Sequence, residues 1–108
     1  MAYRVALAAG AVRDLRSLRA FDRQRIGDQI DSKLPVQPTV ETRHRKQMRM
    51  EKGTFSFEHV PPVWELQIGD FRVYYDVDEQ SQVVNVRAIR RKLPHRTTKE
   101  SLHEDADN

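Results

Sequence analysis

Arginine and lysine side chains gather in two short windows that contain no acid, and such side chains bind phosphate groups. The windows are 43–50, RHRKQMRM, and 86–99, VRAIRRKLPHRTTK. Together they hold ten of the 19 cations, where even scatter would place about four. A further arginine, Arg72, stands inside the apolar-alternating run FRVYYDV beside Tyr74. Cations with a neighbouring tyrosine predict a surface that holds a nucleic-acid backbone and stacks a base.

Length and composition bound the domain organisation. The chain has 108 residues, of which 38% are hydrophobic, so it can form one small core and not two. We therefore expect a single domain over residues 1–100, followed by an acidic, frayed tail at 101–108. The net charge of +3 favours an anionic partner only weakly, and the clustering of the cations carries more information.

Several classes of protein are disfavoured by what the sequence lacks. There are no cysteines, and the four histidines have no metal-ligand spacing, so we predict no disulfide, no metal site and no cofactor. No apolar run approaches the roughly 20 residues that span a bilayer, and the N-terminal stretch does not read as a secretion signal. The expectation is a soluble cytoplasmic protein with no membrane partner.

The first half of the chain predicts a strand and two helices. Residues 3–8, YRVALA, alternate like a short strand, and from residue 11 the apolar residues recur at helical spacing. Asp22 is the expected N-cap of the second helix, whose apolar residues recur every four positions. The prolines of PVQPT at 35–39 end that helix, because proline lacks an amide donor.

The second half predicts strands. Residues 63–69 and 71–77 alternate strictly, and the Gly69-Asp70 link between them favours an antiparallel hairpin. Residues 83–89 form a further β-branched run, and 43–50 a weak strand. The pattern leaves open whether 51–62 is an extra hairpin or a loop.

These elements predict an α+β fold in which an N-terminal strand and an α-hairpin pack on one face of a mostly antiparallel four- or five-stranded sheet. Trp64, Phe71 and Tyr75 fall on the core side. The opposite side carries Glu65, Gln67, Arg72 and Tyr74, and strand alternation adds Arg43, Arg45 and Arg49, with Arg87 and Arg91 at the end of the last strand.

The same residues carry a family resemblance. The helical stretch VRDLRSL, the hairpin WELQIGDFRVYYDVD and the last strand VNVRAIRRK resemble the RelE/ParE superfamily of toxins from type II toxin-antitoxin systems. The stretch ETRHRKQMR resembles the TRNRK run that precedes the hairpin in one branch. The likeness spans about residues 3–92, and its most specific part is the G-D-[YF]-R-V-x-Y hairpin.

The resemblance implies a small toxin that a cognate antitoxin, encoded by a neighbouring gene, wraps and neutralises. RelE-like members cleave mRNA in the ribosomal A site, so the ribosome and mRNA are the implied partners. ParE-like members instead poison DNA gyrase. A third alternative is a RelE-type fold that has lost its chemistry and only binds, and because all three share one fold, the fold does not choose between them.

The RelE catalytic set carries over only in part. The hairpin arginine falls at Arg72, and the arginine after the last strand at Arg91. The two RelE lysines fall on Val63 and Glu65, and the terminal tyrosine falls near Thr97. The arginine of W-E-L-R is replaced by Gln67.

RNA cleavage without a metal needs a base, an acid, and cations that stabilise the phosphorane. Arginine serves only the last role, because it stays protonated. The predicted catalytic residues are Arg72, Arg91 and Arg45 as cations and Glu65 as base, with His44, Lys46, Tyr74 and His95 as other candidates for base and acid. The predicted RNA-binding residues are Arg43, Lys46, Arg49, Tyr74, Arg87, Arg90 and Lys92.

Overall fold

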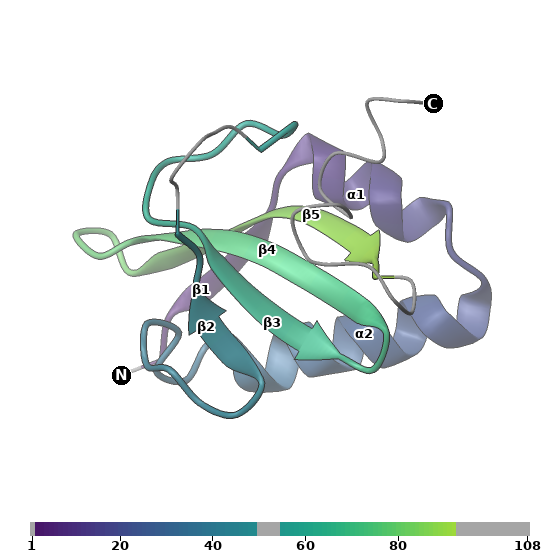
Figure 1. Ribbon diagram of the computed structural model, residues 1–108, viewed down its shortest axis with the longest axis horizontal. Coiled ribbons are helices and arrows are strands. Elements are labelled where there is room, and N and C mark those ends of the chain that lie inside the picture. Colours follow the sequence, from purple (N-terminus) through teal and green to yellow (C-terminus); the bar gives the residue numbers. More distant parts are fainter. Residues whose placement is uncertain (1, 50–54, 93–108) are drawn as a thin grey trace.

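A computed structural model describes residues 2–49 and 55–92. The elements follow the chain as β1 (Arg4–Leu7), α1 (Ala9–Arg16), α2 (Ala20–Lys33), β2 (Arg45–Gln47), β3 (Trp64–Ile68), β4 (Phe71–Asp78) and β5 (Val83–Arg91) (Figure 1). The expected order of one strand, two helices and four strands is confirmed. The predicted acidic tail at 101–108 lies outside the described residues.

The strands form one sheet in the order β1-β5-β4-β3-β2. β1 runs parallel to β5, and the other neighbours are antiparallel. Gly69 adopts a left-handed φ of 59° in the two-residue link between β3 and β4, a conformation that glycine adopts without steric cost. This turn fixes the register that places Gln67 opposite Arg72.

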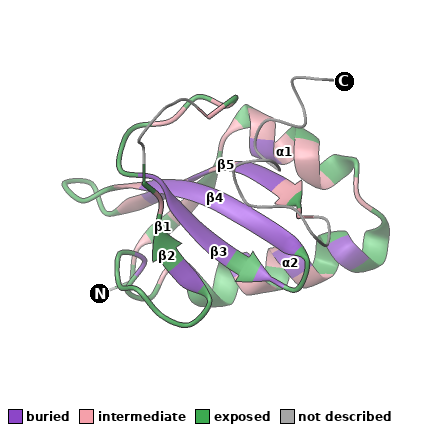
Figure 2. Ribbon diagram, viewed as in Figure 1, coloured by how far each residue is buried: buried purple, intermediate pink, exposed green. Residues whose placement is uncertain are grey.

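Both helices cover the same face of the sheet, and α2 passes behind β3 and β4 in Figure 1. Ala11 of α1 and Ile26 and Ile30 of α2 pack against the inward residues of the strands, among them Trp64 and Tyr75. The inward rows of β3 and β4 are almost fully buried, as Figure 2 shows. The α+β architecture and the predicted core aromatics are thereby confirmed.

The start of α2 differs from the prediction. The helix begins at Ala20 with Arg19 as N-cap, so Asp22 lies inside the first turn and is not the cap. There its carboxylate lies near the positive end of the helix dipole and within 4 Å of Arg19, Arg25 and Arg91. Asp22 is therefore a buried, paired carboxylate of the first turn and not a cap.

A β-bulge in β5 changes which of its residues share a face. Tyr74 lies opposite Ala88, whereas Tyr75 lies opposite Val86, so Arg87 is an extra residue in β5. Because side chains alternate strictly along a strand, one inserted residue reverses the faces of everything beyond it. Arg90 therefore lies opposite Arg72, and Arg91 lies opposite Phe71. The expectation that Arg87 and Arg91 share a face is wrong for this reason.

Segment 55–62, which we call the aromatic strap, crosses the sheet face that the helices leave uncovered. It contains neither helix nor strand, so within the described residues the loop alternative for 51–62 holds. Phe55 and Phe57 pack with Met48 on a small second core of Val63, Tyr74 and Ala88. This sheet face is therefore not open over its whole width.

Candidate functional site

Lys46, Glu65 and Tyr74 form one row across β2, β3 and β4 on the face away from the helices. The Tyr74 hydroxyl donates to Oε2 of Glu65 at 3.0 Å. Lys46 Nζ lies 3.9 Å from Oε1 of the same carboxylate. Glu65 is only 4% exposed, and Tyr74 is completely buried. The Glu65 carboxylate is thus buried in the middle of the row, between the buried Tyr74 and the exposed Lys46.

Tyr74 is held in its protonated form. Burial, followed by the negative charge of Glu65 and the hydrogen bond to it, raises the pKa of Tyr74 above its ordinary value, although Arg72 and Arg90 oppose the shift. A phenol with a raised pKa donates its hydrogen bond over the whole physiological range. Tyr74 therefore acts here as a fixed donor to Glu65, and its buried ring offers no face on which a base could stack.

Arg72 and Arg90 lie side by side in the next row of the same face. Nη1 of Arg72 donates to the carbonyls of Gly69 and Phe71, each at 2.9 Å, and its Nε lies 3.9 Å from Glu65. Arg90 donates to the carboxylate of Asp14, which also accepts from the amide of Ile89. The two positively charged guanidinium groups can lie next to each other because each has a carboxylate nearby and donates to at least one backbone carbonyl.

The aromatic strap packs on Tyr74, at one end of the row formed by Lys46, Glu65 and Tyr74. The Phe57 ring stacks on Tyr74 with centroids 5.6 Å apart, and Phe55 stacks on Phe57 at 5.0 Å. Next to this stack, the amide of Val60 donates to Oδ2 of the buried Asp76 at 2.8 Å. The strap is therefore attached at two points, through its aromatic rings and through its backbone.

Asp76 is the residue that sequence reasoning missed on this face. Its carboxylate is 2% exposed and accepts two hydrogen bonds from Arg87, the shorter at 2.7 Å. Asn85 Nδ2 adds a third contact at 3.2 Å. An acid that alternates with Arg72 and Tyr74 in one strand is the signal in the sequence that could have found it. Arg87, which the sequence predicts to bind RNA, forms an ion pair with Asp76.

Two of the four predicted catalytic residues lie on the helix side of the sheet. Arg45 is opposite Leu66, and its guanidinium donates to the carbonyls of Lys33 at 2.9 Å and Gln37 at 2.6 Å. It thus satisfies backbone groups at and beyond the C-terminal end of α2. The prediction that Arg45 shares a face with Arg72 is wrong, because the alternation along β2 places Lys46, and not Arg45, on that face.

Arg91 also lies on the helix side. Its guanidinium carbon is 4.8 Å from the centroid of the Phe71 ring, and it lies 3.7 Å from Asp22 and 3.9 Å from Asp70. Because of the bulge in β5, Arg90 takes the position beside Arg72 that the sequence had assigned to Arg91. Of the predicted catalytic set, the structure thus brings together only Glu65 and Arg72.

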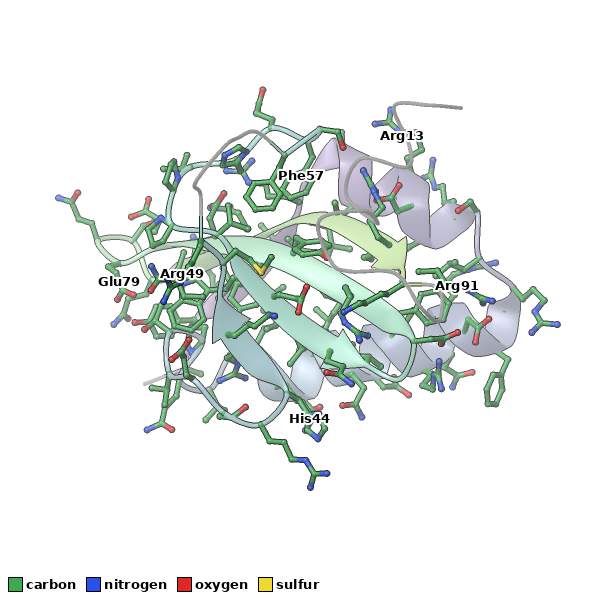
Figure 3. All side chains as sticks on the ribbon, in the orientation of Figure 1. Arg13, His44, Arg49, Phe57, Glu79 and Arg91 are labelled. Atoms are coloured by element: carbon green, nitrogen blue, oxygen red, sulfur yellow. The ribbon has the colours of Figure 1, made fainter. Side chains whose placement is uncertain are left out.

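The predicted RNA-binding residues divide by exposure. Arg43, Lys46 and Arg49 are exposed along β2 and its flanks, and Arg49 and Arg91 lie at opposite ends of the molecule (Figure 3). Lys92 is partly buried, and its amide donates to the carbonyl of Asp70. His44 is exposed beside β2, and His95 and Thr97 lie outside the described residues. The described cations thus form separate groups instead of one continuous patch.

The described residues contain no cluster of three or more potential metal ligands of the His, Cys, Asp or Glu type. No helix among residues 2–49 and 55–92 has the length and apolar character needed to cross a membrane.

Comparison with known proteins gives one family match. The family model described as the ParE toxin of type II toxin-antitoxin systems, parDE, matches residues 5–93. Among curated proteins, no sequence matches significantly.

Solved structures share the fold. The Mycobacterium tuberculosis toxin-antitoxin complex RelBE2 contains a chain with a TM-score of 0.68 and 19% identity, which covers 85% of this chain and 100% of that one. The RelE-RelB complex of Pyrococcus horikoshii gives 0.63 and 23%, covering 90% and 100%. A mutant of the E. coli toxin RelE in the free state gives 0.64 and 18%, covering 97% and 98%. At these identities the likeness concerns the arrangement of helices and strands.

Proposed function

The chain belongs to the ParE toxin family of type II toxin-antitoxin systems, and from this premise we propose that it poisons its target by binding and does not itself cleave RNA. DNA gyrase is the proposed target, since ParE-like toxins act on it. The proposed setting is the cytoplasm. This choice places the gyrase alternative ahead of the mRNA endoribonuclease that the sequence favoured.

The burial of Glu65 is the observation that carries the proposal. A general base must come within roughly 3 Å of the proton that it removes. Glu65 is 4% exposed, its carboxylate accepts the hydrogen bond of the Tyr74 hydroxyl, and the aromatic strap packs on that tyrosine. A ribose hydroxyl could reach this carboxylate only if the side chains around it moved away.

The positions of the arginines support the same conclusion. Metal-free RNA cleavage concentrates cations around the reacting phosphate. Arg45 and Arg91, which were expected to supply that charge, make their contacts on the other side of the sheet. Arg72 directs Nη1 to two backbone carbonyls of its own hairpin. A toxin that acts through its surface requires none of these groups to converge.

A cognate antitoxin, encoded by a neighbouring gene, is the proposed physiological partner. Two of the structural neighbours were solved as toxin-antitoxin complexes. The basic surface of this chain, with a net charge of +3, suits a partly acidic antitoxin segment.

One observation favours the second candidate, a ribosome-dependent mRNA endoribonuclease. Arg72 and Arg90 lie opposite each other with the exposed Lys46 on the same face. If ribosome binding displaced the aromatic strap, these cations and Glu65 would face the substrate together. This candidate makes Glu65 indispensable, whereas the binding toxin does not use its acidity.

Expression of the chain from a tightly controlled promoter separates the candidates. Bulk translation and DNA-damage signalling are followed in one culture for the wild type and for Glu65→Gln. The amide side chain introduced by Glu65→Gln still accepts the Tyr74 hydrogen bond but cannot take up a proton. Glu58→Gln, an exposed change in the strap, is the matched control.

We expect damage signalling before translation falls, equally in all three proteins, together with inhibition of purified gyrase. A rapid translation block that Glu65→Gln abolishes, while circular dichroism shows an intact fold, would refute the proposal and favour the endoribonuclease. If neither translation nor DNA-damage signalling changed, the chain would instead be a binding module without toxicity.

A further inference from the structure

The link between α1 and α2 forms an exposed corner that the site described above does not include. We call residues 13–23, RDLRSLRAFDR, the arginine corner. It contains the end of α1, the link and the first turn of α2. Figure 1 places it at the end of the molecule toward which β5 runs. Its four arginines are all exposed: Arg13, Arg16, Arg19 and Arg23.

The two acids of the corner are already paired with β5. Asp14 accepts from the backbone amide of Ile89 at 2.9 Å and forms an ion pair with Arg90. Asp22 is 7% exposed and lies 3.7 Å from Arg91. Because arginines of another element balance both carboxylates, the four arginines of the corner remain as an excess of positive charge.

The arginines of the corner have few partners within the molecule. The side chains of Arg13 and Arg16 make no ion pair or hydrogen bond with any residue of 2–49 and 55–92. Arg19 lies 3.8 Å from one acid, but its side chain is 86% exposed, and Arg23 donates one hydrogen bond to the carbonyl of Leu18. Arg13 and Arg16 are three positions apart in α1, so they leave the same helix face about 5–6 Å apart. Guanidinium groups presented in this way bind phosphate oxygens.

Phe21 narrows the kind of partner. It is 74% exposed and lies between Arg19 and Arg23 in the sequence, and it is the single exposed large apolar side chain of residues 13–23. A protein interface needs a wider apolar centre, whereas a nucleic-acid backbone is bound mainly through charge. A phenyl ring beside phosphates packs better on deoxyribose than on ribose, whose 2′-hydroxyl would lose water there. The combination favours DNA.

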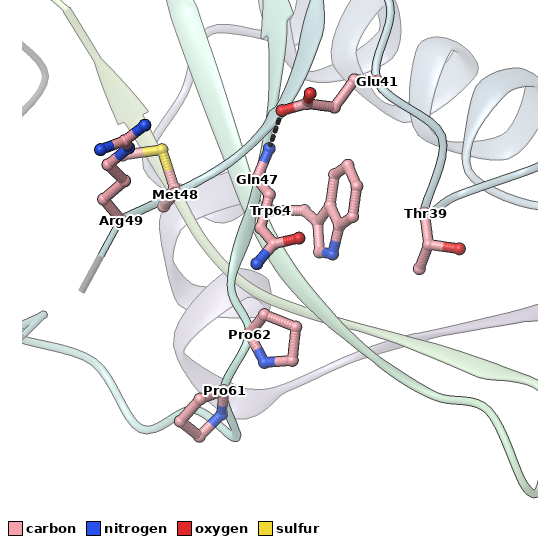
Figure 4. Close-up of a pocket in the computed structure, with 8 residues that line it drawn as sticks. All are labelled: Thr39, Glu41, Gln47, Met48, Arg49, Pro61, Pro62 and Trp64. Atoms are coloured by element: carbon pink, nitrogen blue, oxygen red, sulfur yellow. Dashed lines mark hydrogen bonds between the residues drawn. The ribbon is translucent and has the colours of Figure 1, made fainter.

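The β2 edge, which also carries arginines, has a different charge pattern. Figure 3 shows Arg13 and Arg91 on the side of the molecule away from Arg49. Arg49 lines a groove of about 1030 Å³ together with Trp64 and the exposed Glu41 (Figure 4). The Glu41 carboxylate opposes the approach of a phosphate, and no such exposed acid occurs in residues 13–23.

We infer that the arginine corner binds the phosphate backbone of duplex DNA. The four arginines contact phosphates, and Phe21 packs on a deoxyribose between them. The inference rests on the proposed function only in taking the DNA that gyrase holds as the natural ligand. In that complex the toxin contacts the DNA as well as the enzyme.

The experiment measures binding of the purified full chain to a short labelled DNA duplex by fluorescence anisotropy, over a series of salt concentrations and without gyrase. Arg13→Ala/Arg16→Ala removes two charges from the corner. Arg4→Ala/Lys33→Ala removes two exposed charges from the opposite end of α2, about 20 Å away, and is the matched control. Phe21→Ala tests the ring. An RNA duplex of the same sequence is titrated in parallel.

Four phosphate contacts should make the wild-type affinity fall roughly a hundredfold between about 50 and 200 mM salt. We expect Arg13→Ala/Arg16→Ala to halve the slope of log affinity against log salt and to weaken binding at least about tenfold. Arg4→Ala/Lys33→Ala should stay within about twofold of the wild type. Phe21→Ala should bind roughly threefold more weakly with an unchanged slope, because the ring carries no charge.

Absence of duplex binding at low salt, equal losses in the two double variants, or tighter binding of the RNA duplex would each overturn the inference. Inhibition of purified gyrase is scored separately. A chain that binds DNA but leaves gyrase active would contradict the proposed function and support the inference. A chain that inhibits gyrase but binds no duplex would overturn the inference and leave the proposed function standing.

Discussion

Replacement of Arg45 by methionine tests whether this arginine holds the fold together or takes part in chemistry. Its side chain lies in the interior, and the residue is 7% exposed. Its Nη1 and Nη2 donate to the carbonyls of Gln37 and Lys33, at 2.6 and 2.9 Å. Methionine preserves most of the apolar stem but leaves both carbonyls without that donor.

The expected loss follows from those two contacts. Hydrogen bonds to charged groups contribute about 1.5–3 kcal/mol each. Part of that gain is already offset in the wild type by the burial of the guanidinium, whose Nε has no partner among the described residues. We therefore expect Arg45→Met to lower the free energy of unfolding by about 3 kcal/mol. Arg49→Met, at an exposed position in the same segment, should change it by less than about 0.5 kcal/mol.

Urea unfolding followed by Trp64 fluorescence measures this difference. For a domain of this size, with a slope of about 1.5 kcal/mol per molar urea, the midpoint of Arg45→Met should fall by about 2 M. A midpoint within experimental error of Arg49→Met would refute the structural role. If Arg45→Met also lost toxicity while remaining stable, the original catalytic prediction would be restored.

Three further predictions concern stability. Arg87→Met leaves the buried Asp76 carboxylate without its charged partner, so it should lower the free energy of unfolding by about 3 kcal/mol. Thermal or urea unfolding measures this, and an unchanged transition would contradict the pairing. Burial raises the pKa of Tyr74 and of Tyr75, so the folded state retains protons that the unfolded chain loses above about pH 10. Stability should therefore be fully present below that pH and fall as the pH rises beyond it, and the fall in a urea series should be shallower in Tyr74→Phe. Gly69→Ala should lower the free energy of unfolding by about 1 kcal/mol because the φ of Gly69 is positive, and Gly69→Asn should lower it by less. Equal stability of the two variants would argue against the left-handed turn.

Much of the fold could be read from local pattern. The alternation in WELQI and FRVYYDV placed Trp64, Phe71 and Tyr75 on the buried side, and the structure buries all three. The Gly69-Asp70 turn defined the register, because a two-residue link allows little choice of pairing. Glu65 and Arg72 were correctly placed on one face for the same reason. These features depend on residues close together in the chain.

The candidate site could be predicted less well, because it depends on contacts between distant segments. The aromatic strap reaches Tyr74 and Asp76 from 16 or more positions away, and its sequence carries no periodic signal. Alternation along the weak strand 43–50 does not define which face is which, so the sequence places Arg45 with Arg72, whereas the pairing of β2 with β3 puts Lys46 there. Its true partners, Lys33 and Gln37, belong to the end of α2 and the following loop.

The sequence by itself determined the order of the elements, the faces of the central hairpin and the superfamily, because each depends on local periodicity, turn chemistry or a short motif. Only the tertiary structure decided which arginine adjoins Arg72. The extra residue at Arg87 is accommodated by pairing between β4 and β5, and it exchanges the faces of Arg90 and Arg91. Likewise, only the tertiary packing decided that Glu65 is buried beside Tyr74 and Arg72. Since a side chain's chemistry depends on its access to solvent and neighbours, local pattern identified the candidate residues and long-range packing determined which of them are accessible.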